Sequence, residues 1–136
     1  MSGILLFIAL TLFCSITSAT PAVPDLTGNW TGTSVGYDRE GGYDGPSNWT
    51  FLVTIVEQRG RVFNGTIGYS NMSNLSQKGS VGFSGVMGND LESFYLTEYG
   101  SGYVIGKIID TDMMEFIYLE SADGSAAIDT LTRVKP

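Results

Sequence analysis

The side chains most often used in catalysis are scarce in this sequence. The chain of 136 residues contains no histidine, and its single cysteine, Cys14, lies inside an apolar N-terminal segment. Zinc–imidazole sites and thiol nucleophiles are therefore not expected in the folded part of the chain. Serine, threonine, tyrosine, lysine and carboxylates remain, but they show no spacing typical of a nucleophile with its base. We expect no enzymatic activity and no cofactor.

Carboxylates are the most abundant groups with binding potential. Three of them fall in one glycine-rich stretch, residues 38–47, and two more flank a predicted turn at residues 110–112. Loop carboxylates can bind calcium, but this spacing does not match the ligand register of a calcium-binding loop. We interpret them as solvated turn residues and predict no metal site. Three further glutamates in predicted strands are expected to face outward: Glu92, Glu98 and Glu115.

The charged residues make the chain acidic. Its 14 acidic and 7 basic residues all follow the apolar N-terminal segment and give a net charge of −7. This field repels nucleic acid and anionic lipid headgroups. We therefore expect neither nucleic acid nor a membrane as a partner of the mature chain.

The N-terminal segment has the layout of a secretory signal peptide. Residues 4–16 are almost unbroken apolar sequence, and small residues, including Thr17-Ser18-Ala19, follow through Ala22. The apolar run of about 13 residues is short for a membrane span, which needs about 20. We predict a cleaved signal peptide over residues 1–22 and a single secreted or cell-surface domain over residues 23–136. An uncleaved membrane anchor is the alternative.

Asparagines occur in a pattern that points to export. Five of the 6 asparagines begin an Asn-x-Ser/Thr triplet. This excess suggests a pathway that N-glycosylates its cargo, although serine, threonine and asparagine are also common in β proteins. The candidate glycosylation sites are Asn29, Asn48, Asn64, Asn71 and Asn74.

The elements that must position any site are β-strands. Residues 49–58 alternate, with Trp49, Phe51 and Val53 on one face, and no segment has helical periodicity over a useful length. Short turns rich in glycine, asparagine and aspartate separate the apolar runs. Strands are expected at residues 27–37, 49–58, 61–69, 79–87, 91–99, 103–109, 113–120 and 126–134.

Eight consecutive strands joined mostly by short turns favour an antiparallel meander. Closing the meander removes both exposed edges. We therefore predict an all-β fold, a single eight-stranded antiparallel up-and-down β-barrel. An open β-sandwich is the alternative.

The two ends of the predicted domain resemble a known superfamily. Gly28-x-Trp30 opens the first strand and Arg133 ends the last, as in the calycin pattern of lipocalins, fatty-acid-binding proteins and avidins. The resemblance implies that Trp30 plugs one end of the barrel while Arg133 lies across its indole, a cation–π contact worth about 1 kcal/mol. The avidin group is most similar, through LTGNW (residues 26–30), TFLVT (50–54), NGT (64–66) and the ending DTLTRVKP.

The biotin-binding residues of avidins carry over poorly. Asp129 matches the aspartate that accepts a hydrogen bond from a ureido nitrogen, but Gly32, Ile67 and Tyr69 stand where the donors to the ureido oxygen are expected. A buried carbonyl without donors loses the compensation for its desolvation. Tight biotin binding is therefore not expected.

Two functions remain open at this stage. The first is a secreted binding protein whose open barrel holds a small apolar or amphipathic molecule, with Asp129 as its polar handle. The second is a structural or cell-envelope protein with a filled barrel, in which Asp129 forms an ion pair or faces solvent. Outward apolar residues, Leu52 and Val56, also allow a homo-oligomer. The aromatic side chains expected to line an open barrel are some of Trp49, Tyr69, Phe94, Tyr95, Tyr103 and Tyr118.

Overall fold

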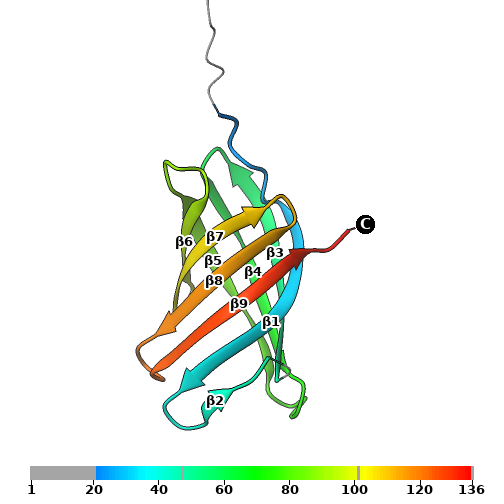
Figure 1. Cartoon of the computed structure of the whole chain (residues 1–136), viewed down its shortest axis with the longest axis vertical. Helices are drawn as coiled ribbons and strands as arrows, with labels where there is room; N and C mark the ends of the chain where they lie inside the picture. The colour runs from blue at the N-terminus through cyan, green and yellow to red at the C-terminus, as the bar shows by residue number, and fades with distance from the viewer. Residues whose placement is uncertain (1–20, 47, 101, 136) are drawn as a thin grey trace, which may run out of the picture.

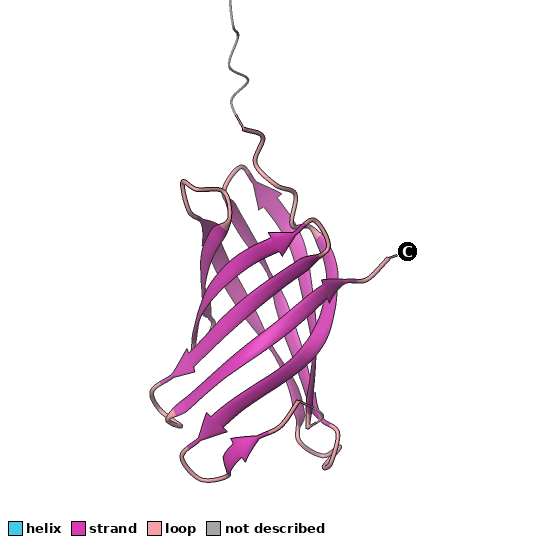
Figure 2. Ribbon diagram, in the orientation of Figure 1, coloured by secondary structure: helices cyan, strands magenta, loops and turns pink. Residues whose placement is uncertain are grey.

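The computed structural model describes residues 21–46, 48–100 and 102–135. Residues 1–20, most of the predicted signal peptide, lie outside this part of the chain. Within it, every regular element is a β-strand (Figure 2), and no helix is long and apolar enough to cross a membrane. The strands are β1 (Gly28–Asp38), β2 (Gly42–Asp44), β3 (Trp49–Arg59), β4 (Val62–Asn71), β5 (Lys78–Met87), β6 (Ser93–Glu98), β7 (Tyr103–Asp110), β8 (Met113–Glu120) and β9 (Ser125–Arg133).

The strands form one closed antiparallel barrel. β1 pairs with β3 on one side and with β9 on the other, and β3 to β9 pair in chain order (Figure 1). The barrel therefore contains eight strands, as the sequence predicts, and the sandwich alternative is wrong. β2 is an addition inside the predicted glycine-rich loop, and it pairs only with the last residues of β1.

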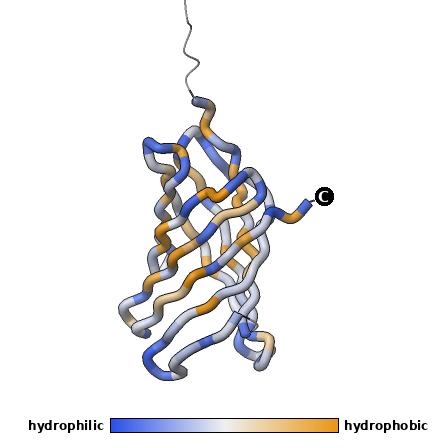
Figure 3. The backbone as a smooth tube through the Cα atoms, viewed as in Figure 1, coloured by the Kyte–Doolittle hydropathy of each residue, from blue (hydrophilic) through white to orange (hydrophobic). Residues whose placement is uncertain are grey.

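Alternation along the strands divides the side chains between the barrel interior and the outer wall. Hydrophilic residues gather in turns at both ends of the barrel, and hydrophobic ones recur along the strands (Figure 3). Four phenylalanine rings meet edge to face in the interior, with centroids 5.4–6.1 Å apart. Strand glycines make room for them, because a Cβ atom on Gly106 would lie 1.9 Å from the ring of Phe94. These rings fill one half of the barrel.

The filled half is closed by Trp30. Its side chain is only 1% exposed, and its indole Nε1 donates to the carbonyl of Leu26, at 3.0 Å. The guanidinium carbon of Arg133 lies 4.1 Å from the indole centroid, so the expected contact is present. Arg133 also donates to the carbonyls of Thr27 (2.7 Å) and Asp25 (2.9 Å). The segment before β1 is thereby tied across this end of the barrel.

A bulge in β3 strengthens this closure. The register between β3 and β4 shifts between Ile55 and Glu57, and the intervening Val56 is 67% exposed. The shift brings Gln58 toward the N-terminal segment, where its side chain accepts from Leu26 N at 2.8 Å and donates to Pro24 O at 2.7 Å. A hydrogen-bonded segment with Leu26 buried beneath it therefore covers this end, and access to the interior remains at the other end.

Candidate functional site

The opposite half of the barrel contains a cavity of about 520 Å³. The core ends beneath it at Val53, Phe116 and Leu131, and the turns around residues 38, 100 and 123 lie at its mouth. β1, β3, β4, β8 and β9 contribute most of its walls. Small inward residues on β1 and β9 leave part of this space open: Ser34, Gly36 and Ala127.

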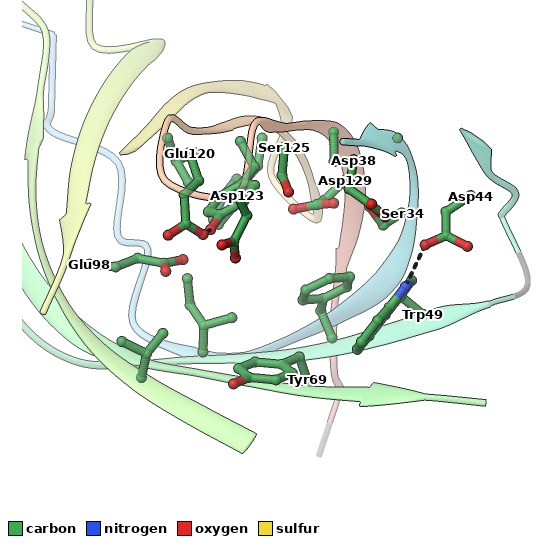
Figure 4. A pocket seen from close by; sticks show the side chains of 18 of the residues that line it. Ser34, Asp38, Asp44, Trp49, Tyr69, Glu98, Glu120, Asp123, Ser125 and Asp129 are labelled. Carbon is green, nitrogen blue, oxygen red and sulfur yellow. Dashed lines mark hydrogen bonds between the residues drawn. The ribbon is translucent and has the colours of Figure 1, made fainter. Parts of the chain in front are cut away.

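One wall of the cavity is aromatic. Trp49 and Phe51 of β3 and Tyr69 of β4 line it, and the rings of Trp49 and Tyr69 lie 6.2 Å apart at 58°. Asp44 of β2 accepts a hydrogen bond from Trp49 Nε1 at 2.9 Å, which fixes the indole at the mouth (Figure 4). The short strand β2 therefore positions part of the site.

The facing wall is acidic. Six of the 14 acidic residues of the chain line the cavity, whereas none of the 7 lysines and arginines does. In Figure 4 their carboxylates lie across the cavity from Tyr69 and Trp49, apart from Asp44, which is on the side of Trp49. The six carboxylates belong to Asp38, Asp44, Glu98, Glu120, Asp123 and Asp129.

Asp129 is the most buried of these carboxylates. It is 6% exposed and lies on β9 between Ser34 of β1 and Phe116 of β8. Burial raises the pKa of Asp129 to about 6, although a hydrogen bond from the Ser34 side chain acts in the opposite direction. Its Oδ1 atom is buried and has no hydrogen-bond partner among the described residues. An acceptor of this kind is uncommon in folded proteins.

Burial and nearby negative charge also raise the pKa values of Glu98 and Tyr118. Burial, followed by the negative charges of Glu120 and Asp129, raises the pKa of Glu98 to about 7. Burial also raises the pKa of Tyr118, whose hydroxyl donates a hydrogen bond to Glu120. Negative charge is thus concentrated at the mouth without an internal cation to offset it.

Four of the six predicted binding residues line the cavity, namely Trp49, Tyr69, Tyr118 and Asp129. Phe94 and Tyr103 do not, and their predicted place in its wall is wrong. Phe94 points inward but belongs to the filled half, where it is 1% exposed. Tyr103 is 66% exposed on the outer wall, because its neighbour Val104 takes the inward position. Tyr95 likewise faces outward, at 50% exposure.

The acidic wall is the part of the site that the sequence does not predict. Glu98 was expected to face outward, but it lines the cavity. The spacing within its strand predicts an inward Glu98, because Phe94, Leu96 and Glu98 are two residues apart and share the inward face. Asp38 and Asp44 were interpreted as solvated turn residues, and the pairing of β1 with β2 instead places them at the mouth.

The five glycosylation candidates lie outside the cavity wall. Asn29, Asn64 and Asn74 are exposed, whereas Asn48 and Asn71 are half-buried. The side-chain amides of the latter two donate to Asp44 and Gln77, at 2.8 and 2.9 Å. Their attachment nitrogens are therefore already engaged within the fold.

Two further features limit the ligand chemistry of the site. Among the described residues, no group of three or more His, Cys, Asp or Glu side chains is placed to hold a metal ion.

A Cβ atom on Gly32 would lie 1.9 Å from the carbonyl oxygen of Thr130. The backbone of β9 thus leaves no room for any side chain at position 32.

Comparison with known proteins identifies the fold alone. No family model and no curated protein matches the sequence. A solved structure that does match is a de novo designed fluorescence-activating β-barrel, with a TM-score of 0.53 and 13% sequence identity. The match covers 79% of this chain and 93% of the designed one.

Proposed function

We propose that this protein is a secreted, non-enzymatic module that binds a small molecule inside its barrel. The single observation that carries the proposal is the half-filled interior: tightly packed rings at one end and a cavity of about 520 Å³ at the other. Small-molecule sites typically measure about 300–1,000 Å³ and combine apolar walls with a few polar groups. A barrel with a purely structural role has no need of such a space, so the cavity favours binding over the filled-barrel alternative.

The proposal also includes export from the cell, N-glycosylation and a distant relationship to calycins. Residues 1–22 have the layout of a signal peptide, and exposed asparagines at positions 29, 64 and 74 begin glycosylation triplets. The stacked pair Trp30–Arg133 supports a distant relationship to calycins, with avidins as the most similar group. The mature chain is proposed to act outside the cell or at its surface.

Filling the cavity tests the function. Ala127→Trp places an indole in the cavity from β9, whereas Ala126→Trp places the same side chain on the outer wall of the same strand. We expect the wild type and Ala126→Trp to bind a neutral solvatochromic dye such as Nile red with one-to-one stoichiometry, and Ala127→Trp to lose binding at least tenfold. Dye fluorescence and calorimetry measure this. Equal binding by both variants contradicts the proposal, as does a wild type that binds neither this dye nor the small amphipathic probes described below.

The outer wall favours self-association. One row of exposed apolar side chains crosses six neighbouring strands without a charged residue, each paired with the next. Single exposed apolar residues are ordinary, but a continuous row marks an interaction surface. The row winds around more than half of the barrel, so only a section of it, such as Tyr95, Ile105 and Ile117 on β6 to β8, can meet the same section of a second copy across a two-fold axis. The row consists of Val62, Val86, Tyr95, Ile105, Ile117 and Ile128, which are 39–55% exposed.

We propose a homo-oligomer formed through this row. Ile117→Lys is expected to shift the sedimentation coefficient of the protein to that of a monomer, because a buried lysine at the contact lacks a partner. Leu75→Lys makes the same change at an exposed site between β4 and β5, outside the row and outside β3, and is expected to leave assembly intact. A wild type that sediments as a monomer at 100 µM, or equal dissociation by both variants, contradicts this assignment.

A further inference from the structure

The charge of the cavity constrains what can enter it. Six carboxylates line it and no lysine or arginine does, so its wall carries most of the net charge of −7. The ion pairs that the structure shows lie elsewhere: Arg133 and Lys135 with Asp112 at the closed end, and Arg59 with Glu57 on the surface. Anions are therefore repelled from the cavity and cations are attracted to it.

Asp129 adds an observation that surface charge alone does not explain. An acidic rim is ordinarily a solvated surface, but this carboxylate is 94% buried, since 6% of it is exposed, and it lies in the cavity wall. Its Oδ1 atom has no hydrogen-bond partner in the part of the chain described. A buried acceptor left unpaired destabilises the fold. A positive charge in the cavity beside this side chain offsets the cost by stabilising the ionised carboxylate.

The wall opposite the carboxylates places a second requirement on the chemistry of the ligand. Trp49, Phe51 and Tyr69 line the cavity with apolar and aromatic surface. In Figure 4, Trp49 and Tyr69 lie across the cavity from Glu98, Asp123 and Asp129. Aromatic faces bind both apolar groups and organic cations. A bare metal ion makes no use of this surface. Among the described residues, no group of three His, Cys, Asp or Glu side chains is placed to hold one.

We infer that the cavity binds an organic cation, an amine or quaternary ammonium joined to an apolar body, with the charge at Asp129 and the body against Trp49 and Tyr69. This inference rests on the proposed function and narrows its ligand class. Glu98, Glu120 and Asp123 line the entrance on the acidic side and draw the cation in.

Three probes with one body and different charge test the inference. They are 4-phenylbutylamine, 4-phenylbutanol and 4-phenylbutyrate, which at pH 8 are a cation, a neutral molecule and an anion. Calorimetry on the purified wild-type protein is expected to show the amine binding at least tenfold more tightly than the alcohol, and the butyrate most weakly. The fluorescence of Trp49 is expected to change on binding while that of buried Trp30 does not, so the Trp49→Phe variant loses the signal.

Charge-neutralising variants locate the site. Asp129→Asn and Glu98→Gln are expected to reduce amine affinity at least tenfold and severalfold, respectively, and to leave alcohol affinity unchanged. Glu115→Gln removes the same charge on β8 from a position that alternates with inward Met114 and Phe116, and it serves as the control. It is expected to bind all three probes as the wild type does.

Three other outcomes are possible, and each contradicts either the cation inference, its site or the proposed function. Equal binding of amine and alcohol overturns the cation inference and leaves the proposed function standing. An amine preference that survives both Asp129→Asn and Glu98→Gln places the cation elsewhere and overturns the site. No binding of any probe at millimolar concentration, together with no binding of the neutral dye, overturns the proposed function itself.

Discussion

Replacing Trp30 with alanine is expected to lower the free energy of unfolding by about 3–5 kcal/mol. The indole is 1% exposed and is one of the largest fully buried side chains. Its removal leaves a cavity at the closed end and takes away the donor to the carbonyl of Leu26. Urea unfolding measures the change, with an unaltered m-value as the sign that the same two states are compared.

Trp49 provides the matched control for this prediction. It is the other tryptophan of the chain, and it lies half-buried at the mouth of the cavity. Trp49→Ala is expected to cost clearly less, because solvent already reaches the ring and little packed space is lost. Equal losses for the two variants would mean that Trp30 is not the plug of a tightly packed end.

Arg133 tests the same contact from the other side. Its guanidinium lies 4.1 Å from the Trp30 centroid, and it also donates to two backbone carbonyls of the N-terminal segment. In a double-mutant cycle, Trp30→Ala and Arg133→Ala are expected to show a coupling energy of about 1 kcal/mol. Additive losses would show that the stacked geometry contributes nothing and that Arg133 acts only through its hydrogen bonds.

The closed end was predictable because its signals are local. Gly28-x-Trp30 and Arg133 are short motifs at the start of β1 and the end of β9, and the pairing of these two strands in the closed barrel brings them together. Strand positions were predictable for a similar reason. Side chains alternate strictly between two environments, so strands such as β8 (Met113–Glu120) coincide with their predicted bounds.

The division of the interior into a core and a cavity was not predictable in this way. Alternation tells which side chains point inward but not how far along the barrel axis they lie. That height depends on the stagger between neighbouring strands. Phe94 and Glu98 share one inward face of β6, yet the first belongs to the core and the second to the mouth. Their order along β6 is fixed by the sequence, but which end of the strand lies in the packed half depends on how β6 pairs with β5 and β7.

The acidic wall is a tertiary property for the same reason. Its six carboxylates come from turns and strands that are distant in sequence, so no motif spans them. Asp129 alone was selected from the sequence, through its resemblance to the last strand of avidins. Asp129 lines the cavity together with five other carboxylates, and neither a lysine nor an arginine is among the lining residues.

The stability of the ligand-free protein is expected to rise as the pH falls from about 8 to about 5. The folded-state pKa values of Glu98, about 7, and Asp129, about 6, lie above their ordinary values of 4.5 and 3.8. Between these limits the folded protein binds more protons than the unfolded chain, so stability is lost as the pH rises through the folded values. The surrounding Glu120, Asp123 and Tyr118 supply no positive charge that reverses this sign.

The rise is expected to end near pH 4. Asp25 and Asp90 have pKa values held below 3.8 by hydrogen bonds from Thr27 and Ser93, respectively. Their contribution is present above the ordinary value and is lost as the pH falls through the lowered one. Thermal melts across this range should therefore show a maximum in Tm at mildly acidic pH, several degrees above the value at pH 8.

The Asp129→Asn variant shows how much of this pH dependence of stability comes from the cavity. The change from 3.8 to about 6 corresponds to at most about 3 kcal/mol. Removing the charge is therefore expected to stabilise the ligand-free protein at pH 8 and to flatten its profile between pH 4 and 6. Glu115→Gln is expected to leave the profile unchanged. If Asp129→Asn instead destabilises the protein at pH 8, the carboxylate is paired within the fold and no cation is needed to satisfy it. A variant that is more stable but binds the amine less tightly is the expected signature of a residue retained for a ligand.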